Sequence, residues 1–436
     1  MANTRLTRAA GTATTATKYT LSMWIKRSKL GSEMNLIGVS SGNTIELIKF
    51  NSNNKLYWYN RDAASNAAEN YTSNVFRDTS GWYHLVFSYD STQNAAANQR
   101  KLYINGVNQT WGSVAAIQSN AVAGMNLSGA TRTIGAESSP SNYFDGSMSH
   151  IHFVDGTVYA ASTFGSTDST TGEWKINTSP SITMGNNGFT ILKDGNTITD
   201  QSSNSNNFSL ASGTLTKTED CPSNVFATIN PLFFASDAAT FANGNNTVNY
   251  NTDNSRSAFG SLGMTSGKYY FEVKIVSDSN NRGSYGICDT LYSNLNLTGA
   301  FIDTSSGYAY SADGQKVNGG SSSSFGDAIT TGAIVGVALD MDNLKVYFSK
   351  NGTWQNSGNP ASGSTGTGAA FTVTAGRTYL PAIRMRNGTK GSFNFGNGVF
   401  VTTAVSSAGT NASGNGVFEY DVPSGYSALS TKGLNL

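Results

Sequence analysis

Charged side chains are scarce in this 436-residue sequence. Asp, Glu, Lys and Arg make up 13% of it, about half of the ~25% that is usual for soluble proteins. Proline is rare, with 7 residues, and runs of helix-forming residues at a 3.6 period are hard to find. Ser, Thr and Asn take the polar positions, beside 47 glycines and 11% aromatic residues. This composition is typical of short strands joined by glycine turns, and it predicts an all-β protein.

The balance of charge argues against two kinds of partner. The net charge is +1 and the basic residues form no stripe, so the electrostatic attraction on which nucleic-acid binding depends is weak. No apolar run approaches the ~18 residues that span a bilayer. The N-terminus, MANTRLTRAAGTATTATKYT, lacks the apolar core of a secretory signal. We expect synthesis in a cytosol, no nucleic-acid partner and no membrane insertion.

Cysteine is nearly absent, with Cys221 and Cys288 as the two examples. Their spacing matches no metal-binding motif, and two residues do not make a disulfide framework. A reducing site of synthesis favours free thiols. The sequence therefore predicts two free, inert cysteines.

One β-hairpin pattern occurs twice in the chain. In AIVGVALDMDNLKVYFSKNGTW, residues 333–354, an apolar strand and a polar turn precede an alternating strand and Asn351-Gly352. Asn-Gly supplies the two positive φ angles of a tight hairpin turn. A second copy begins at Trp82 with WYHLVFSY and ends with KLYING at Gly106. At 436 residues the chain is long for one core, so we expect two domains with one such hairpin in each.

Short strands follow one another at regular intervals along the first half. In YTLSMWIK, residues 19–26, Leu21, Met23 and Ile25 alternate with Thr20, Ser22 and Trp24. Strands of this length, separated by Gly, Asn and Ser turns, predict an antiparallel β-sandwich.

The first half resembles a laminin-G-like (LamG), concanavalin-A-like jelly roll. The pieces YTLSMWIKRS, GWYHLVFSYD, RKLYINGV, TIGA and YFDGSMSHIHFVDG follow the order of that family over roughly residues 15–160. The second half resembles a SPRY domain over about residues 235–400, in GKYYFEV, YGIC, GYAY, VGVALD, FSKNG, RTYLPA and GSFNFG. The resemblances imply two β-sandwiches in tandem.

The segment between the halves resembles a connecting segment of structural proteins from tailed bacteriophages, especially marine ones. DQSSNSNNF, residues 200–208, and PSNVFATINPL, residues 222–232, carry this resemblance. Cys221 departs from the family pattern, which has a small residue there. The C-terminal FEYDVPSGYSALSTKGLNL resembles the ending of the same proteins.

These patterns predict five parts. Residues 1–17 form a Thr/Ala-rich arm, either a flexible lead-in or an anchor, and residues 18–165 form the LamG-like jelly roll. Residues 166–234 connect the domains and pack in part on the first. Residues 235–405 form the SPRY-like sandwich, and residues 406–436 form an ordered tail.

The sequence shows little sign of catalytic chemistry. Jelly-roll glucanases place acids on alternate positions of one strand, and no such run is present. His150 and His152 are two residues apart on an expected strand, the spacing that begins some zinc sites. A structural role is the favoured interpretation for both, and packing or hydrogen bonding is expected of His84. No triad with a G-x-S-x-G serine is found, so we predict a protein that is not an enzyme.

Calcium is the one metal ion for which the sequence offers candidate oxygen ligands. LamG-like folds often bind it through loop oxygens, which hard cations prefer. Asn142, Asp145 and Asp155 lie near the strand that closes the jelly roll and are candidate ligands. The alternative is that they are ordinary turn-forming residues. No other cofactor is predicted.

Aromatic residues mark the expected ligand-binding surfaces, because sugars are held by aromatic faces together with amide and carboxylate groups. In KLYWYNRD, strand alternation places Tyr57 and Tyr59 on one face and Trp58 on the other. In the SPRY-like half the candidates are Tyr308, Tyr310 and Trp354. For each residue, a place in the sandwich core is the alternative.

The resemblances imply a phage virion structural protein, as a tail fibre, spike or capsid appendage. Its expected function is attachment to a host surface glycan or protein, and its expected location is the surface of the particle. Partners would be other virion proteins and further copies of the chain, with a trimer expected of such appendages. One alternative is a decoration or cement protein that clamps neighbouring subunits through the N-terminal arm. A glycan-degrading virion enzyme is the other.

Overall fold

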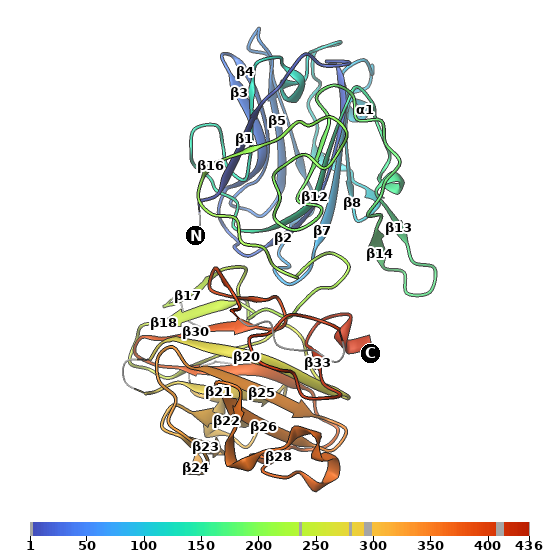
Figure 1. Ribbon diagram of the computed structural model, residues 1–436. Helices are drawn as coiled ribbons and strands as arrows, with labels where there is room; N and C mark the ends of the chain where they lie inside the picture. Colours follow the sequence, from blue (N-terminus) through green and yellow to red (C-terminus); the bar gives the residue numbers. More distant parts are fainter. Residues whose placement is uncertain (1–2, 235–237, 279–280, 292–298, 407–413, 436) are drawn as a thin grey trace. The chain divides into compact units, whose positions relative to one another are not determined.

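The computed structural model describes residues 3–234, 238–278, 281–291, 299–406 and 414–435. The chain divides into two compact units, Met1–Lys217 and Thr218–Leu436, and each is considered by itself (Figure 1). Both units are built from antiparallel sheets, as the sequence predicts. No helix in the described ranges is long and apolar enough to cross a membrane.

Two sheets face each other in the first unit. The first has the order β10 (Trp111–Ser113), β6 (Ala67–Thr72), β5 (Leu56–Arg61), β4 (Thr44–Phe50), β3 (Met34–Ser41), β11 (Thr131–Ile134), β1 (Arg5–Ala9), β16 (Ser209–Ser212). The second has the order β15 (Phe189–Ile191), β12 (Gly146–Asp155), β2 (Lys18–Arg27), β7 (Tyr83–Asp90), β8 (Arg100–Ile104), β9 (Val107–Asn108). Their facing side chains form one core, which includes Leu21, Met23 and Ile25 of β2 and Trp58 of β5.

A further layer covers the outer face of the second sheet. Residues 156–184 contain β13 (Gly165–Thr167) and β14 (Trp174–Ile176), which pair with each other. Phe164 and Trp174 pack on Val86 and Val154, which point outward from β7 and β12. This covering layer explains why Trp24 is buried although it lies on the face of β2 opposite Leu21. The short helix α1 (Ala96–Gln99) joins the first-unit strands β7 and β8.

The second unit is also a two-sheet sandwich. One sheet has the order β17 (Ala239–Ala242), β18 (Thr247–Tyr250), β30 (Thr389–Asn394), β20 (Lys268–Ser277), β25 (Ile334–Asp340), β26 (Lys345–Lys350), β27 (Thr353–Trp354), with β28 (Phe371–Thr372) beside β26 and β33 (Ser427–Ala428) beside β20. The other has the order β19 (Arg256–Phe259), β29 (Tyr379–Met385), β21 (Ser284–Asp289), β22 (Gly307–Ser311), β23 (Gln315–Asn318), β24 (Ser321–Ser324). A small pair consists of β31 (Val399–Phe400) and β32 (Thr403–Ala404).

The repeated hairpin is present in both units. Strands β25 and β26 pair in the second unit, as β7 and β8 do in the first. Each second strand then ends at the predicted Asn-Gly turn. Asn105 and Gly106 have φ angles of 46° and 82°, and Asn351 and Gly352 have 47° and 78°. The turns thus have the left-handed backbone that Asn-Gly favours.

Three predicted boundaries differ from the structure. Residues 5–9 of the supposed arm are strand β1, held between β11 and β16 of the first sheet. The connecting segment divides, with residues 166–217 in the first unit and 218–234 in the second. The tail belongs to the second sandwich, because β33 pairs with β20 and Phe418, Tyr426 and Leu429 are buried in its core.

Candidate ligand-binding face

The outer face of the first sheet carries a group of tyrosines on three neighbouring strands. Alternate residues of β4, β5 and β6 are buried, so the others point away from the core. We call this surface the tyrosine face. It consists of Ile45, Leu47, Lys49, Tyr57, Tyr59, Arg61, Ala67, Glu69 and Tyr71.

The strand register sets these side chains in three rows. Lys49, Tyr57 and Tyr71 are direct neighbours across the strands, and Leu47, Tyr59 and Glu69 form the next row. Ile45, Arg61 and Ala67 form the third. Adjacent rows are about 7 Å apart and adjacent strands about 5 Å apart. The three tyrosine rings therefore stand close together, with amphipathic and charged side chains around them.

Polar contacts fix the orientation of the first row. Tyr57 donates a hydrogen bond to Glu69 Oε2, and burial together with this bond raises the pKa of the Tyr57 phenol. Lys49 Nζ lies 3.0 Å from Glu33 Oε2 and 5.9 Å from the centre of the Tyr57 ring. Lys55 Nζ lies 5.3 Å from the centre of the Tyr71 ring. The rings are thus held in place while their outer sides stay accessible.

The inner side of the same strands is a buried polar network that stiffens the face. Trp58 Nε1 donates to Glu46 Oε1 at 3.0 Å. Arg100 donates to the carbonyl oxygen of Trp58 at 3.1 Å, to Asn60 Oδ1 at 2.9 Å and to Asn70 Oδ1 at 2.6 Å. Because these bonds join β5 and β6 from behind, the spacing of the tyrosines does not depend on flexible loops.

A polar cavity of about 190 Å³ lies where β5 turns into β6. It shares Arg61 and Ala67 with the tyrosine face and is also lined by Asn66 and Gln118. Asp62, another lining residue, accepts hydrogen bonds from the backbone and side-chain nitrogens of Asn66. These bonds, the side-chain one first, lower the pKa of the carboxyl group. The cavity therefore offers both a carboxylate and a guanidinium beside the aromatic surface.

Four of the predicted ligand-binding aromatics are not free surface residues. Trp58 is fully buried, and Tyr308 and Tyr310 lie in the core of the second unit. The strand β22 is buried on both faces, because residues 299–303 cover its outer side. Trp354 is partly buried and packs against Tyr270 and Tyr347. Tyr57 and Tyr59 lie together on the outer face of β5, opposite Trp58, which is the alternation that the sequence predicts.

Tyr71 was missed by the sequence reasoning. Its strand, AAENYT, has small and polar residues at the inward positions and so lacks a hydrophobic alternation. Only the pairing of Tyr71 with Tyr57 shows that the two rings share a surface. The one indication in the sequence is a tyrosine in a segment without hydrophobic alternation that follows the aromatic strand.

The three calcium candidates do not meet in space. Asp145 and Asp155 stand at opposite ends of β12, roughly 30 Å apart at ~3.3 Å per residue. Asp155 accepts hydrogen bonds from the backbone nitrogens of Thr14 and Asn187, at 2.7 and 3.1 Å. Asn142 donates to Glu137 Oε1 at 2.9 Å. Asn142, Asp145 and Asp155 therefore do not form one shared calcium site, and the side chains of Asn142 and Asp155 hold loops.

His84 and His152 lie between the second sheet of the first unit and its covering layer, and His150 lies next to His152. His84 stacks on Trp24 with ring centres 4.7 Å apart, and Trp174 Nε1 donates to His84 Nδ1 at 3.0 Å. Indole nitrogen only donates, so His84 carries its proton on Nε2 and donates to Ser22 Oγ at 2.9 Å. Burial, followed by the neighbouring histidines, lowers the pKa of His84 to about 3.

His150 and His152 do not form a regular same-face pair. A β-bulge lies between Ser149 and His152, and His150 has a φ of 47°. Burial lowers the pKa of His150 to about 4 and that of His152 to about 3. Across the described part of the chain, no three His, Cys, Asp or Glu side chains are grouped so that they could hold a metal ion. Cys221 and Cys288 are free, as predicted.

Comparison with known protein families supports the two-domain organisation. Residues 2–163 match the family model of the concanavalin A-like lectin/glucanases superfamily, and residues 268–398 match that of the SPRY domain. The protein therefore has a LamG/concanavalin-A-like domain followed by a SPRY domain, both all-β. Beyond residue 163, β15 and β16 are edge strands of the two sheets of the first unit.

Individual relatives are more distant. The ATP-dependent RNA helicase Ddx1 of Drosophila melanogaster is 29% identical over 137 residues, which are 30% of this chain and 16% of the helicase. The SPRY domain of human HERC1 is 20% identical, with a TM-score of 0.30, over 38% of this chain and 96% of that domain. Stonustoxin is 16% identical, with a TM-score of 0.30, over 40% of this chain and 27% of the toxin.

Proposed function

We propose that the protein attaches to a surface polysaccharide through the tyrosine face of its first unit. The observation that carries the proposal is the placement of Tyr57, Tyr59 and Tyr71 on adjacent positions of two paired strands. Aromatic rings bind the apolar faces of sugars, and charged or amide groups nearby bind the hydroxyl groups. Arg61 and the adjoining cavity supply such groups.

We further propose that this attachment occurs on a bacteriophage particle, as part of a fibre, spike or capsid appendage. The resemblance of residues 200–208 and 222–232 to phage connecting segments supports this location. Weak sugar sites gain strength when many copies act together, as on a virion. The cement-protein alternative invoked a free N-terminal arm, and residues 5–9 are instead fixed within a sheet.

Binding of the full chain to an array of bacterial surface polysaccharides tests the proposal. We expect Tyr59→Ala and Tyr71→Ala each to weaken binding about tenfold, the loss of one good aromatic contact. Tyr103→Ala is the matched control, because Tyr103 is a half-buried tyrosine of the opposite sheet. Binding that is equally weakened by Tyr103→Ala, or absent in the unmodified protein, would contradict the proposal.

Two further measurements separate the alternatives. New reducing ends released from a bound polysaccharide would indicate a glycan-degrading enzyme in place of an attachment protein. Imaging of labelled protein on particles would test the virion location. A position between capsid subunits, with no surface exposed, would favour the cement protein.

A further inference from the structure

An arginine cluster lies at one end of the second sheet of the second unit. The strand β19 begins at Arg256, β21 begins just after Arg282, and β29 ends just after Arg384. Because these strands are antiparallel neighbours, the three positions meet at the same end of the sheet. Arg386 follows directly after β29.

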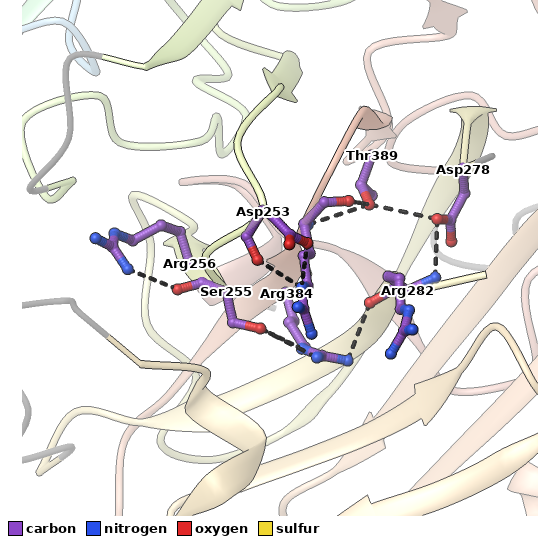
Figure 2. A network of polar contacts seen from close by, with 8 residues as sticks. Asp253, Ser255, Arg256, Asp278, Arg282, Arg384 and Thr389 are labelled. Atoms are coloured by element: carbon purple, nitrogen blue, oxygen red, sulfur yellow. Dashed lines mark hydrogen bonds and ion pairs between the residues drawn. The ribbon is translucent and has the colours of Figure 1, made fainter. Parts of the chain in front are cut away.

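The guanidinium group of Arg384 is bound by neutral oxygens. Its Nε and Nη2 atoms lie 3.2 and 3.0 Å from Ser255 Oγ, and Nη1 lies 3.1 Å from the carbonyl oxygen of Arg282. Figure 2 shows Arg384 between these two partners. Within the described ranges, no carboxylate makes an ion pair with Arg384. Its charge is therefore left without a counter-ion in this half-buried place.

Nearby carboxylates are engaged elsewhere. Asp253 Oδ1 pairs with Arg386 Nε at 3.0 Å. Asp278 accepts hydrogen bonds from the backbone nitrogens of Arg282 and Gly283, at 2.9 and 2.8 Å. Figure 2 shows Asp278 beside Arg282 and Thr389. Asp278 thus serves as the acceptor of a turn, and among the described ion pairs of Arg282, Arg384 and Arg386 the one carboxylate is that of Asp253.

Like charges close together are unfavourable unless an anion shares them. Burial lowers the pKa of Arg384, Asp303 opposes this, and the nearby Arg386 and Arg282 lower it further. Arg282 is exposed. In the described part of the chain, the side-chain hydrogen bonds of Arg386 are made by its Nε atom, which donates to Asp253. Both retain free N–H donors, which form forked hydrogen bonds with carboxylate or sulfate oxygens.

We propose that Arg282, Arg384 and Arg386 bind an oxyanion group, a carboxylate or a sulfate, carried by an acidic polysaccharide. This inference rests on the proposed function and deepens it by naming an acidic polymer as the ligand class. The cluster is compact, and the net charge of the chain is +1. Such a site suits separate anionic substituents better than the continuous phosphate backbone of a nucleic acid.

The test uses the full chain and four immobilised probes: dextran sulfate, polygalacturonate, neutral dextran and single-stranded DNA. We expect tighter binding to one or both acidic polysaccharides than to neutral dextran, and weaker binding as salt rises. Arg282→Gln should weaken binding to the acidic polymer about tenfold, the loss of one charged hydrogen-bonding group. Lys350→Gln removes the same charge from another half-buried position of this unit and should leave binding nearly unchanged.

A second variant guards against misfolding. Arg384→Lys keeps the charge and loses the forked donor geometry. We therefore expect weaker binding to the acidic polymer, while the unfolding midpoint of the free protein stays unchanged. No preference for acidic over neutral polysaccharide, or wild-type binding by both arginine variants, would overturn the inference. Tighter binding to the DNA than to either acidic polysaccharide would overturn the ligand class. Loss of binding in Tyr59→Ala with unchanged arginine variants would overturn this inference alone and leave the proposed function standing.

Discussion

The two sandwiches differ in the buried charged groups that hold their irregular segments: the first unit uses arginines as well as carboxylates, and the described part of the second uses carboxylates. In the first unit the buried charged side chains include Arg27, Arg100 and Arg132. In the second unit Glu272 lies at the centre of a sheet, and no described arginine is buried. In both units a buried charged side chain forms hydrogen bonds with backbone groups of segments that are distant in sequence.

The arginines of the first unit donate to backbone carbonyl oxygens, several of them outside the strands. Arg100 binds the carbonyl oxygens of Ala68 and Ala115 at 3.2 and 2.8 Å. Arg132 binds those of Met125 and Asn187 at 2.7 and 3.0 Å. A buried carbonyl without a hydrogen bond is costly, so each guanidinium allows an irregular segment to be buried.

In the second unit a buried carboxylate accepts hydrogen bonds from backbone nitrogens, as Asp155 does in the first unit. Glu272 accepts hydrogen bonds from the backbone nitrogens of Glu419 and Tyr420, at 3.0 and 2.9 Å. Asn394 also donates to Glu272, at 3.0 Å. This carboxylate therefore holds the C-terminal segment on the sheet. The comparison shows how the segments that cover a sandwich determine its buried charged groups. Unpaired carbonyl oxygens require a buried donor, and unpaired N–H groups require a buried acceptor.

The largest expected difference between the units is their response to acid. The pKa values of His84, His150 and His152 are lowered in the folded first unit, so below about pH 6.5 the unfolded state binds more protons. Stability then falls as pH falls below 6.5, by about 1.4 kcal/mol per pH unit for each histidine until the pH reaches the folded-state pKa of that histidine. Hydrogen exchange followed by mass spectrometry should show the first unit opening before the second between pH 7 and 5. Equal protection of the first unit at both pH values would contradict this.

Removing Arg100 should break the first unit selectively. Arg100→Met leaves several carbonyl and amide oxygens buried without a donor, and we expect a loss of about 3 kcal/mol in the free energy of unfolding. Denaturant unfolding followed by unit-specific hydrogen exchange measures this. Arg61→Met, on the outer face, is the control and should change stability by less than about 0.5 kcal/mol. A similar, small effect of both variants would refute the role given to Arg100.

The second unit should show the reverse pH dependence. Burial raises the pKa of Glu272 to about 7, so the folded state retains a proton that the unfolded state loses near pH 4.5. Stability of this unit then falls as pH rises from about 4.5 to 7, by about 1.4 kcal/mol per pH unit. Glu272→Gln cannot titrate, so this slope should be absent from its unfolding free energy. An identical slope in the variant would assign the effect to another group.

The smallest effects concern the two Asn-Gly turns. A Cβ atom at Gly106 would lie 2.3 Å from the ring of Trp174, and one at Gly352 would lie 2.6 Å from that of Tyr420. Both positions have positive φ, so Gly→Ala should cost about 1 kcal/mol at each. We expect the larger loss at Gly106, because Trp174 is fixed by its bond to His84. Thermal unfolding of both variants checks this order, and a larger loss for Gly352→Ala would reverse it.

The sequence alone determined features that depend on neighbouring residues. Alternation divided the side chains of β2 and β5 between two opposite faces, and Asn-Gly fixed the turns after β8 and β26. Order and spacing of short strands gave the two sandwiches. These features follow from backbone geometry over a few residues, which a sequence displays directly.

Tertiary structure decided what depends on distant partners. Residues 5–9 look unpatterned, yet they become a strand because β11 and β16 lie on either side of them. Tyr310 is buried because other segments close over its strand, and Tyr71 joins the tyrosine face only through its register with Tyr57. The arginine cluster likewise arises where three strand ends meet. Whether a segment becomes a strand, and whether a side chain is buried, depends here on contacts between residues far apart in the sequence. The pattern of neighbouring residues does not reveal these contacts.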